Sequence, residues 1–364
     1  MGKKKGTETE DVVTKKRPKV FEDFADDFFD ASSIMDEKKK IISVSPSFDA
    51  ATGGVPEGCF MALTGKEKIG KTSLALWIAA QAQRQEYANE QLCPEGRMVI
   101  YAQVEHRLKD RDMSGIQGLN MEPDRFQLIQ SSPGKILSSE DYCTRIERVI
   151  NEVPGCVVIV DSFSLLSSQA EQAADIGYQD RGKSNTIISQ LMRKIAAPLA
   201  INKCIVIGIT HGIANTSGYG ASFQEKSANA LKYAEDIKLF GKSTKDWRLS
   251  AKDDDDNSKT PRIGHKTEWL VQFAAINAPG GRVNTHFRYG VGIDVYSELV
   301  EIASELSLLE GTTWVNLSYL GDKAPAKLNG RENVINYLQN NPEHYQELKK
   351  QVYEMCGIDY LLCK

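Results

Sequence analysis

The sequence contains no long hydrophobic run. None of its apolar stretches approaches the roughly 20 residues that a membrane-spanning helix requires. The first residues lack the apolar core of a secretory signal, and Gly6 stands where a myristoylation signal carries Ser or Thr. We therefore expect no membrane partner and a cytoplasmic location.

An excess of charge of one sign and paired cysteines are also missing. The 45 basic and 49 acidic side chains give a formal net charge of −4, so a contact with DNA has to come from a local patch. The seven cysteines are an odd number without a Cys-x-x-Cys pair, which favours free buried thiols in a reducing compartment. Hydrophobic residues make up 41% of the 364 residues, enough for one large core and a smaller domain.

Composition divides the chain into four segments. Residues 1–19 are basic and poor in apolar groups, and we expect a disordered leader that either touches DNA or only adds solubility. Residues 20–40 are acidic and carry phenylalanines three and four residues apart, which suits one face of a short helix that docks on this chain's core or on a neighbouring subunit. Residues 41–293 form the main α/β domain, and residues 294–364 a small C-terminal α/β domain with short helices. The phenylalanines are Phe21, Phe24, Phe28 and Phe29.

Short apolar runs alternate with helical segments in the main domain. The runs predict buried parallel strands at Phe60–Thr64, Met98–Val104, Val157–Asp161 and Ile205–Thr210. Helices are expected near 71–84, 139–152 and 185–200, and later at Ser297–Leu309, Arg331–Asn340 and Glu343–Met355. This alternation predicts a mostly parallel sheet whose ligands lie at the carboxyl ends of the strands. The polar stretch 242–267, with the acidic run Asp253–Asp256, is expected to be a solvated loop rather than a metal site.

A phosphate-binding motif follows the first strand. The octapeptide from Gly65 to Thr72 matches G-x-x-x-x-G-K-[ST] in full, and a helix follows it. Backbone N–H groups and the helix N-terminus favour phosphate there, while Lys71 reaches the β- and γ-phosphates and Thr72 holds Mg²⁺. The sequence thus predicts ATP and Mg²⁺ as cofactors. The expected nucleotide-binding residues are Gly65, Lys66, Glu67, Lys68, Ile69, Gly70, Lys71, Thr72 and Ser73.

Polar side chains end the other three strands. Asp161 ends the third strand and fits a carboxylate that binds Mg²⁺ directly or through water. Glu105 follows the second strand, adjacent in pattern to the phosphate-loop strand, and can deprotonate the water that attacks the γ-phosphate; an exposed loop glutamate is the alternative. His211 follows the fourth strand and can sense the γ-phosphate and pass the signal to the loop after it.

Residues 212–228 include the small, flexible residues Ser217, Gly218, Gly220 and Ser222, which suit a loop that orders on a ligand. In this segment and in the one after Asp161, aromatic side chains can stack on bases and cations can meet phosphates, whereas ordinary solvated loop residues are the alternative. The candidate DNA-binding residues are Tyr178, Arg181, Lys183, Arg193, Tyr219, Phe223 and Lys226.

Taken in chain order, these features resemble the RecA family, including the UvsX recombinases of phages. The likeness covers residues 28–360, in which 167–183 resembles the family's first DNA-binding loop and 212–228 its second. Asn229–Tyr233 is a near-verbatim family motif, and His211 stands where bacterial members carry Gln and the UvsX type carries His. The resemblance implies a RecA-like P-loop ATPase core, a phage type, and a location in the host cytoplasm or a phage replication compartment.

The resemblance also suggests a subunit interface and shows two departures. The interface residues it implies are Phe28, Phe29 and Tyr233. Phe273 and Ala275 stand where bacterial members place two lysines that reach the neighbouring subunit's γ-phosphate. The segment after the catalytic glutamate lacks the aromatic that stacks on adenine, and Arg111 is expected to substitute through its planar face. The cations considered as replacements for the lysines in trans are Arg262 and Lys266.

The resemblance implies a DNA-dependent ATPase for homologous recombination and repair. In this interpretation ATP between subunits holds a helical filament on single-stranded DNA, which pairs with homologous double-stranded DNA; single-strand-binding and loader proteins are further expected partners. Two alternatives remain at this point: an ATP-binding filament scaffold that hydrolyses little, which the missing lysines favour, and a hexameric helicase with the same core.

Overall fold

The computed structural model describes residues 19–29, 39–177, 182–214, 223–225, 229–248 and 260–362, and the chain divides into two units, Met1–Lys39 and Lys40–Lys364. In the first unit, the short helix expected to carry the four phenylalanines is not continuous within the described residues 19–29. Helix α1 (Val20–Asp23) ends after one turn, and a 3-10 turn (Ala25–Asp27) follows it. Acidic side chains at the carboxyl end of α1 oppose the helix dipole, which disfavours its continuation.

The aromatic side chains of this unit do not share one helical face. The rings of Phe21 and Phe28 meet edge to face with centroids 4.7 Å apart. Phe24 and Phe29 are 56% and 80% exposed. The predicted leader, apart from Lys19, lies outside the described residues.

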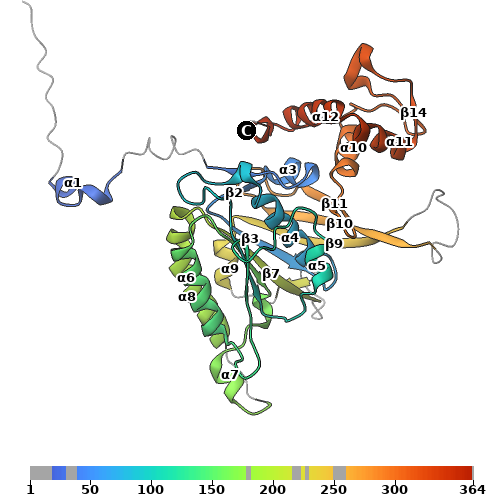
Figure 1. Cartoon of the computed structure of the whole chain (residues 1–364). Helices are drawn as coiled ribbons and strands as arrows, with labels where there is room; N and C mark the ends of the chain where they lie inside the picture. The colour runs from blue at the N-terminus through green and yellow to red at the C-terminus, as the bar shows by residue number, and fades with distance from the viewer. Residues whose placement is uncertain are drawn as a thin grey trace, which may run out of the picture. The chain divides into compact units, whose positions relative to one another are not determined.

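Ten described strands form the central sheet of the second unit (Figure 1). Their order is β12-β11-β10-β9-β3-β7-β6-β4-β5, with β8 paired to β7 outside this order. Neighbours from β9 to β5 are parallel, whereas β8, β10, β11 and β12 pair antiparallel. The bounds are β3 (Phe60–Gly65), β4 (Val99–Gln103), β5 (Phe126–Ile129), β6 (Val157–Asp161), β7 (Ile205–Ala214), β8 (Phe223–Glu225), β9 (Ile237–Arg248), β10 (Arg262–Phe273), β11 (Arg282–Arg288) and β12 (Gly292–Ile293).

Helices cover both faces of the parallel strands. Alternate residues of β6 enter two different cores: Ile159 packs on the face that α4 covers, and Val158 on the face of α6 and α8. Burial on both faces explains why these strands read as continuous apolar runs. The helices are α4 (Lys71–Ala82), α5 (Asp110–Ser114), α6 (Ser139–Glu152), α7 (Gln169–Ala173), α8 (Lys183–Ile201) and α9 (Asn229–Ala234).

The predicted α/β sheet is confirmed, with differences at its edges. The four predicted strands and three helices of this region are present within a few residues of the expected bounds. β5 was not predicted, because this edge strand is short and partly exposed, with Leu128 40% exposed. The strand that precedes Glu105 was expected beside the phosphate-loop strand. This expectation is wrong, because β7 and β6 lie between β4 and β3 in the sheet.

The polar stretch 242–267 is not simply a loop. β9 and β10 continue through it as a paired antiparallel ribbon that extends from the sheet, with Thr244 opposite Thr267 (Figure 1). The ribbon is solvated along much of its length, so its strands carry polar residues and read as a loop, while ladder hydrogen bonds satisfy the backbone. The acidic run Asp253–Asp256 lies outside the described residues.

The C-terminal helices form a separate small core beside the sheet. Leu299, Leu338 and Val352 are among its fully buried residues and come from three different helices. The elements are α10 (Val295–Glu305), α11 (Gly330–Asn340), α12 (Pro342–Met355) and a two-stranded pair, β13 (Trp314–Val315) with β14 (Leu328–Asn329). All three helices match their predicted positions closely.

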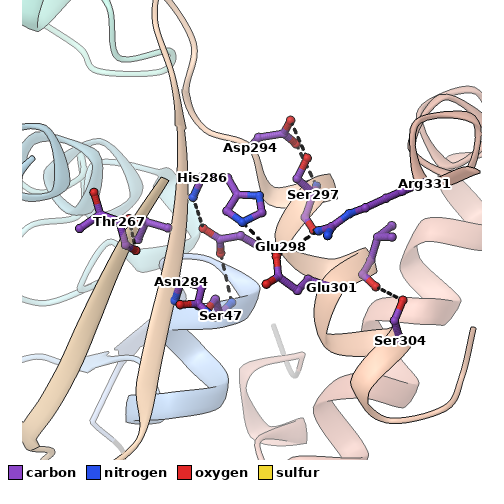
Figure 2. A network of polar contacts seen from close by, with 12 residues as sticks. Ser47, Thr267, Asn284, His286, Asp294, Ser297, Glu298, Glu301, Ser304 and Arg331 are labelled. Atoms are coloured by element: carbon purple, nitrogen blue, oxygen red, sulfur yellow. Dashed lines mark hydrogen bonds and ion pairs between the residues drawn. The ribbon is translucent and has the colours of Figure 1, made fainter. Parts of the chain in front are cut away.

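A buried polar network joins α10 to the sheet and to helix α3 (Pro46–Thr52) (Figure 2). Glu298 accepts hydrogen bonds from the backbone N–H of Ser47 (3.1 Å) and from that of His286 (3.3 Å). One turn further, Glu301 accepts from His286 Nε2 (3.0 Å) and pairs with Arg331 (3.1 Å). Two carboxylates of one helix therefore fix the terminal helices on β11.

Among the described residues, no helix combines the length and apolar character that a bilayer crossing requires.

Candidate nucleotide-binding site

The phosphate loop lies between β3 and α4. Lys71 is the first residue of α4 and is 6% exposed. Its side chain folds back over the loop and donates hydrogen bonds to the carbonyls of Gly65 (2.9 Å) and Lys66 (2.7 Å). Burial lowers the pKa of Lys71, while the charges of Asp161 and Glu105 act in the opposite direction. The first N–H groups of α4 have no helical partner, so this end of the helix suits an anion.

Strand β10 packs directly on the phosphate loop. Thr267 Oγ1 donates to the carbonyl of Ile69 (3.1 Å). Gly70 has φ = 96°, and a Cβ there would lie 2.8 Å from Nε2 of His265. The second loop glycine is thus required both by its left-handed backbone and by the close approach of the imidazole.

Asp161 connects the phosphate loop to the end of β6. Its Oδ2 accepts hydrogen bonds from Thr72 Oγ1 (2.7 Å) and from the hydroxyl of Tyr101 (2.6 Å). The aspartate is 8% exposed, and burial raises its pKa. Oxygen donors beside a phosphate loop are the ligands that Mg²⁺ prefers, so the two residues predicted for the metal fit it. Among the described residues, no group of three or more His, Cys, Asp or Glu side chains is arranged so that it could hold a metal ion by itself.

Glu105 and His211 face each other beside this pair. His211 Nε2 lies 2.6 Å from Glu105 Oε1, and Arg107 lies 3.6 Å from the other carboxylate oxygen. The hydrogen bond from His211 is the main cause that lowers the pKa of Glu105 below 4.5, against the effect of burial. The backbone N–H of His211 donates to Ser164 Oγ (2.9 Å), which ties the end of β7 to the turn after β6.

Two adjoining cavities of 460 and 610 Å³ open along these residues. The smaller is lined by Lys71 and Thr72, the residues predicted to serve phosphate and Mg²⁺, together with Asp161, Glu105 and His211. The larger extends away from the loop. The residues that line both are Ser73, Arg111, Asp112, Arg262 and Tyr289.

The larger cavity contains residues that the sequence did not assign. Tyr289 is an exposed aromatic residue whose ring suits stacking on a nucleotide base. The guanidinium group of Arg262 lies over this ring, 5.5 Å from its centroid. Arg262 was considered as a cation in trans, but it lines this chain's own cavity and pairs with Asp246 (3.0 Å). Lys266 lies elsewhere on the ribbon, beside the ring of Trp247. Arg111, predicted to stack on adenine, lines both cavities with a largely exposed side chain, and its stacking stays a prediction.

The predicted DNA-binding residues are only partly within the described structure. Lys183, at the start of α8, and Arg193 are both exposed. Ten residues of helix place them about 15 Å apart, so they do not form one phosphate site. Tyr178, Arg181, Tyr219 and Lys226 lie outside the described residues, and of Phe223 only the backbone, in β8, is described.

The predicted interface residues are exposed in the single chain. Phe28 is 41%, Phe29 80% and Tyr233 91% exposed. Phe273, at the end of β10 where a lysine was sought, is 52% exposed.

Comparison with known proteins identifies the family. The family model described as the RecA N-terminal domain matches residues 30–294, more than half of the chain. Protein RecA of Streptococcus pyogenes serotype M28 (strain MGAS6180) and that of serotype M5 (strain Manfredo) are each 29% identical to it over 309 residues, which are 84% of this chain and 74% of the relative. The chain therefore belongs to the RecA family.

Proposed function

We propose that this protein is an ATP-dependent recombinase that forms helical filaments on single-stranded DNA and promotes homologous pairing and strand exchange. One observation carries the proposal. A single edge of the sheet gathers a phosphate-loop lysine, a Thr–Asp pair suited to Mg²⁺, and a glutamate held by a histidine that directly precedes a candidate DNA-binding segment. Homology to the RecA proteins of Streptococcus pyogenes supports recombination and repair as the process.

ATP binding would rearrange Lys71. Its ammonium group now donates to the carbonyls of Gly65 and Lys66, and phosphate oxygens would replace these acceptors. Thr72 and Asp161 would hold Mg²⁺, which neutralises charge on the phosphates. Tyr289 and Arg111 would contact the base in the larger cavity.

Hydrolysis would use Glu105 as the base. Its carboxylate takes a proton from water as the water oxygen bonds to the γ-phosphorus, and the bond from that phosphorus to the bridging oxygen breaks to leave ADP. His211 now occupies one carboxylate oxygen. A γ-phosphate that captures the imidazole would release Glu105, so the histidine would link the state of the nucleotide to the state of the base.

The same histidine provides a route to DNA. It precedes the candidate second DNA segment, and its backbone bond to Ser164 reaches the turn that precedes the first. Cations such as Lys183 would meet the DNA backbone, leaving the bases free to pair with a homologous duplex. Phe28, Phe29 and Tyr233 would contact neighbouring subunits. A phage type, for which His211 is the reason, and single-strand-binding or loader partners remain predictions.

The test is ATP hydrolysis stimulated by single-stranded DNA, measured together with strand exchange. We expect both activities in the wild type and neither in Lys71→Ala. If neither activity of the wild type exceeds that of the variant, the proposal is lost. The comparisons lend no support to a helicase or to an inert scaffold.

A further inference from the structure

Tyr101 is an unusual neighbour for the carboxylate of Asp161. It belongs to β4, two positions before the strand ends, and is 1% exposed. Its ring stacks on that of Phe126 with centroids 6.4 Å apart and an interplanar angle of 23°. Its hydroxyl nevertheless reaches the nucleotide cavity and donates to Asp161 Oδ2 over 2.6 Å.

The two hydroxyls that reach Asp161 act on the same oxygen. Thr72 Oγ1 also donates to Oδ2, over 2.7 Å. The donors come from different elements, α4 and β4, so together they hold the carboxylate in one orientation. Within the described residues, no donor reaches the other oxygen, Oδ1. The arrangement leaves one carboxylate oxygen available to a metal ion or to water bound to it.

We propose that Tyr101 is a positioning residue for Mg²⁺: its hydroxyl fixes the carboxylate of Asp161 so that Oδ1 can serve the metal of a bound nucleotide. The inference rests on the proposed function, because it concerns the metal of the same site. Hydrogen bonds to ligating carboxylates commonly change metal affinity by about 10- to 100-fold when they are removed. Without the tyrosine hydroxyl, Thr72 would be the one remaining hydrogen-bond donor to Oδ2 among the described residues, and Thr72 is itself expected to bind the metal.

The alternative is that Tyr101 only fills the core and satisfies its own hydroxyl. Tyr142 provides the comparison, because it is 2% exposed and its hydroxyl donates over 3.0 Å to the carbonyl of Gln103 in the same strand β4. Removing that hydroxyl costs a partly buried hydrogen bond without touching a carboxylate. A purely structural role predicts similar effects of the two Tyr→Phe changes.

The experiment compares wild type, Tyr101→Phe and Tyr142→Phe as full-length proteins saturated with a non-hydrolysable ATP analogue. Mn²⁺ binding is followed by electron paramagnetic resonance and Mg²⁺ by its competition with Mn²⁺, and affinity for ADP is measured in EDTA. We expect Tyr101→Phe to weaken metal affinity about 10-fold or more. Its metal-free ADP affinity should stay within about twofold of wild type, and Tyr142→Phe should keep both affinities.

Metal affinity of Tyr101→Phe within twofold of wild type would overturn the inference alone, and so would an equal loss of metal affinity in Tyr142→Phe. A loss of metal-free ADP affinity in Tyr101→Phe equal to its loss of metal affinity would also refute it, since the tyrosine would then support the fold of the site. A wild type that binds no nucleotide would instead refute the proposed function, and this inference with it.

Discussion

His211 Nε2 and Glu105 Oε1 lie 2.6 Å apart although their strands, β7 and β4, are not neighbours in the sheet. Strand β6 lies between them and ends at Asp161, the residue suited to the metal. The contact between His211 and Glu105 therefore spans the position of β6 in the sheet. An ionised carboxylate only accepts hydrogen bonds, which makes Nε2 the donor. Glu105 is therefore held ionised and weakly basic while His211 is bound to it.

Glu105→Gln should abolish most hydrolysis while nucleotide still binds. The amide keeps the size of the side chain but cannot take a proton from water, and loss of a general base commonly costs about 10²- to 10⁴-fold in rate. Phosphate release measured beside ATP-analogue affinity separates the two effects. Rates above a tenth of the wild-type value would show that Glu105 is not the base.

His211→Ala should shift the acidic side of the pH–rate profile. The hydrogen bond from His211 lowers the pKa of Glu105, so its loss should raise that pKa and move the acid limb of kcat/KM to higher pH. Stimulation by DNA should fall as well, because the variant lacks the imidazole that contacts Glu105, although the backbone N–H of residue 211 can still donate to Ser164. An unchanged acid limb in ATPase assays from pH 4.5 to 7 would exclude control of Glu105 by the histidine.

Local sequence patterns were sufficient for the phosphate side of the site. Lys71 and Thr72 belong to a contiguous motif, Asp161 ends β6 and His211 follows the apolar run of β7, so parallel pairing brings these positions to one edge of the sheet. The order of the strands in the sheet, in contrast, could not be predicted from local patterns. Nothing in the residues near Glu105 places β6 and β7 between its strand and β3, because that order depends on where the helical crossovers pack.

The base side of the site could not be predicted in the same way. Arg262 begins β10 and Tyr289 lies in the turn after β11, and the polar ribbon of β9 and β10 has the composition of a loop. Only the pairing of β10 with β9 brings His265 and Thr267 onto the phosphate loop. The signal missed was the alternation of polar and apolar residues in β10, where Thr267, Trp269 and Val271 are buried on one face.

Tyr289→Ala should weaken ATP binding through the base alone. Stacking of a base on an aromatic ring contributes about 1–3 kcal/mol by alanine substitution, which is roughly 5- to 150-fold in affinity. Inorganic triphosphate should bind the variant as it binds wild type, since Tyr289 lies beyond the phosphate loop. Trp314→Ala is the matched control, because this exposed aromatic belongs to the distant β13. Equal losses for ATP and triphosphate would place the tyrosine outside the base site.

Replacing Phe28 and Phe29 together by Ala should impair assembly without affecting the fold. Phe29 is 80% and Phe28 41% exposed in the single chain, and apolar contacts at the centre of an interface commonly contribute more than about 1 kcal/mol each. Sedimentation with ATP analogue and single-stranded DNA should show shorter assemblies, while mononucleotide affinity is retained. Assemblies of wild-type size would remove these residues from the subunit interface.

Glu298 should make the stability of the protein depend on pH. Burial raises its pKa from 4.5 to about 8, against the two backbone N–H groups that favour the charged form. The folded state therefore favours the protonated carboxyl, so the contribution of Glu298 is fully present below pH 4.5 and is lost as pH rises towards 8. The slope is at most about 1.4 kcal/mol per pH unit.

The matched comparison is Glu298→Gln with Glu301→Gln, two residues of one helix and one network (Figure 2). The hydrogen bond from His286 lowers the pKa of Glu301 to about 2, so its contribution is lost only as pH falls below 4.5. Urea unfolding between pH 5 and 8 should therefore show a flatter fall in stability for Glu298→Gln, whose amide cannot ionise, and an unaltered fall for Glu301→Gln. Because the Gln amide cannot accept from both N–H groups, the first variant should also be less stable at pH 5. Parallel curves for wild type and Glu298→Gln would show that this carboxyl is already ionised throughout the range.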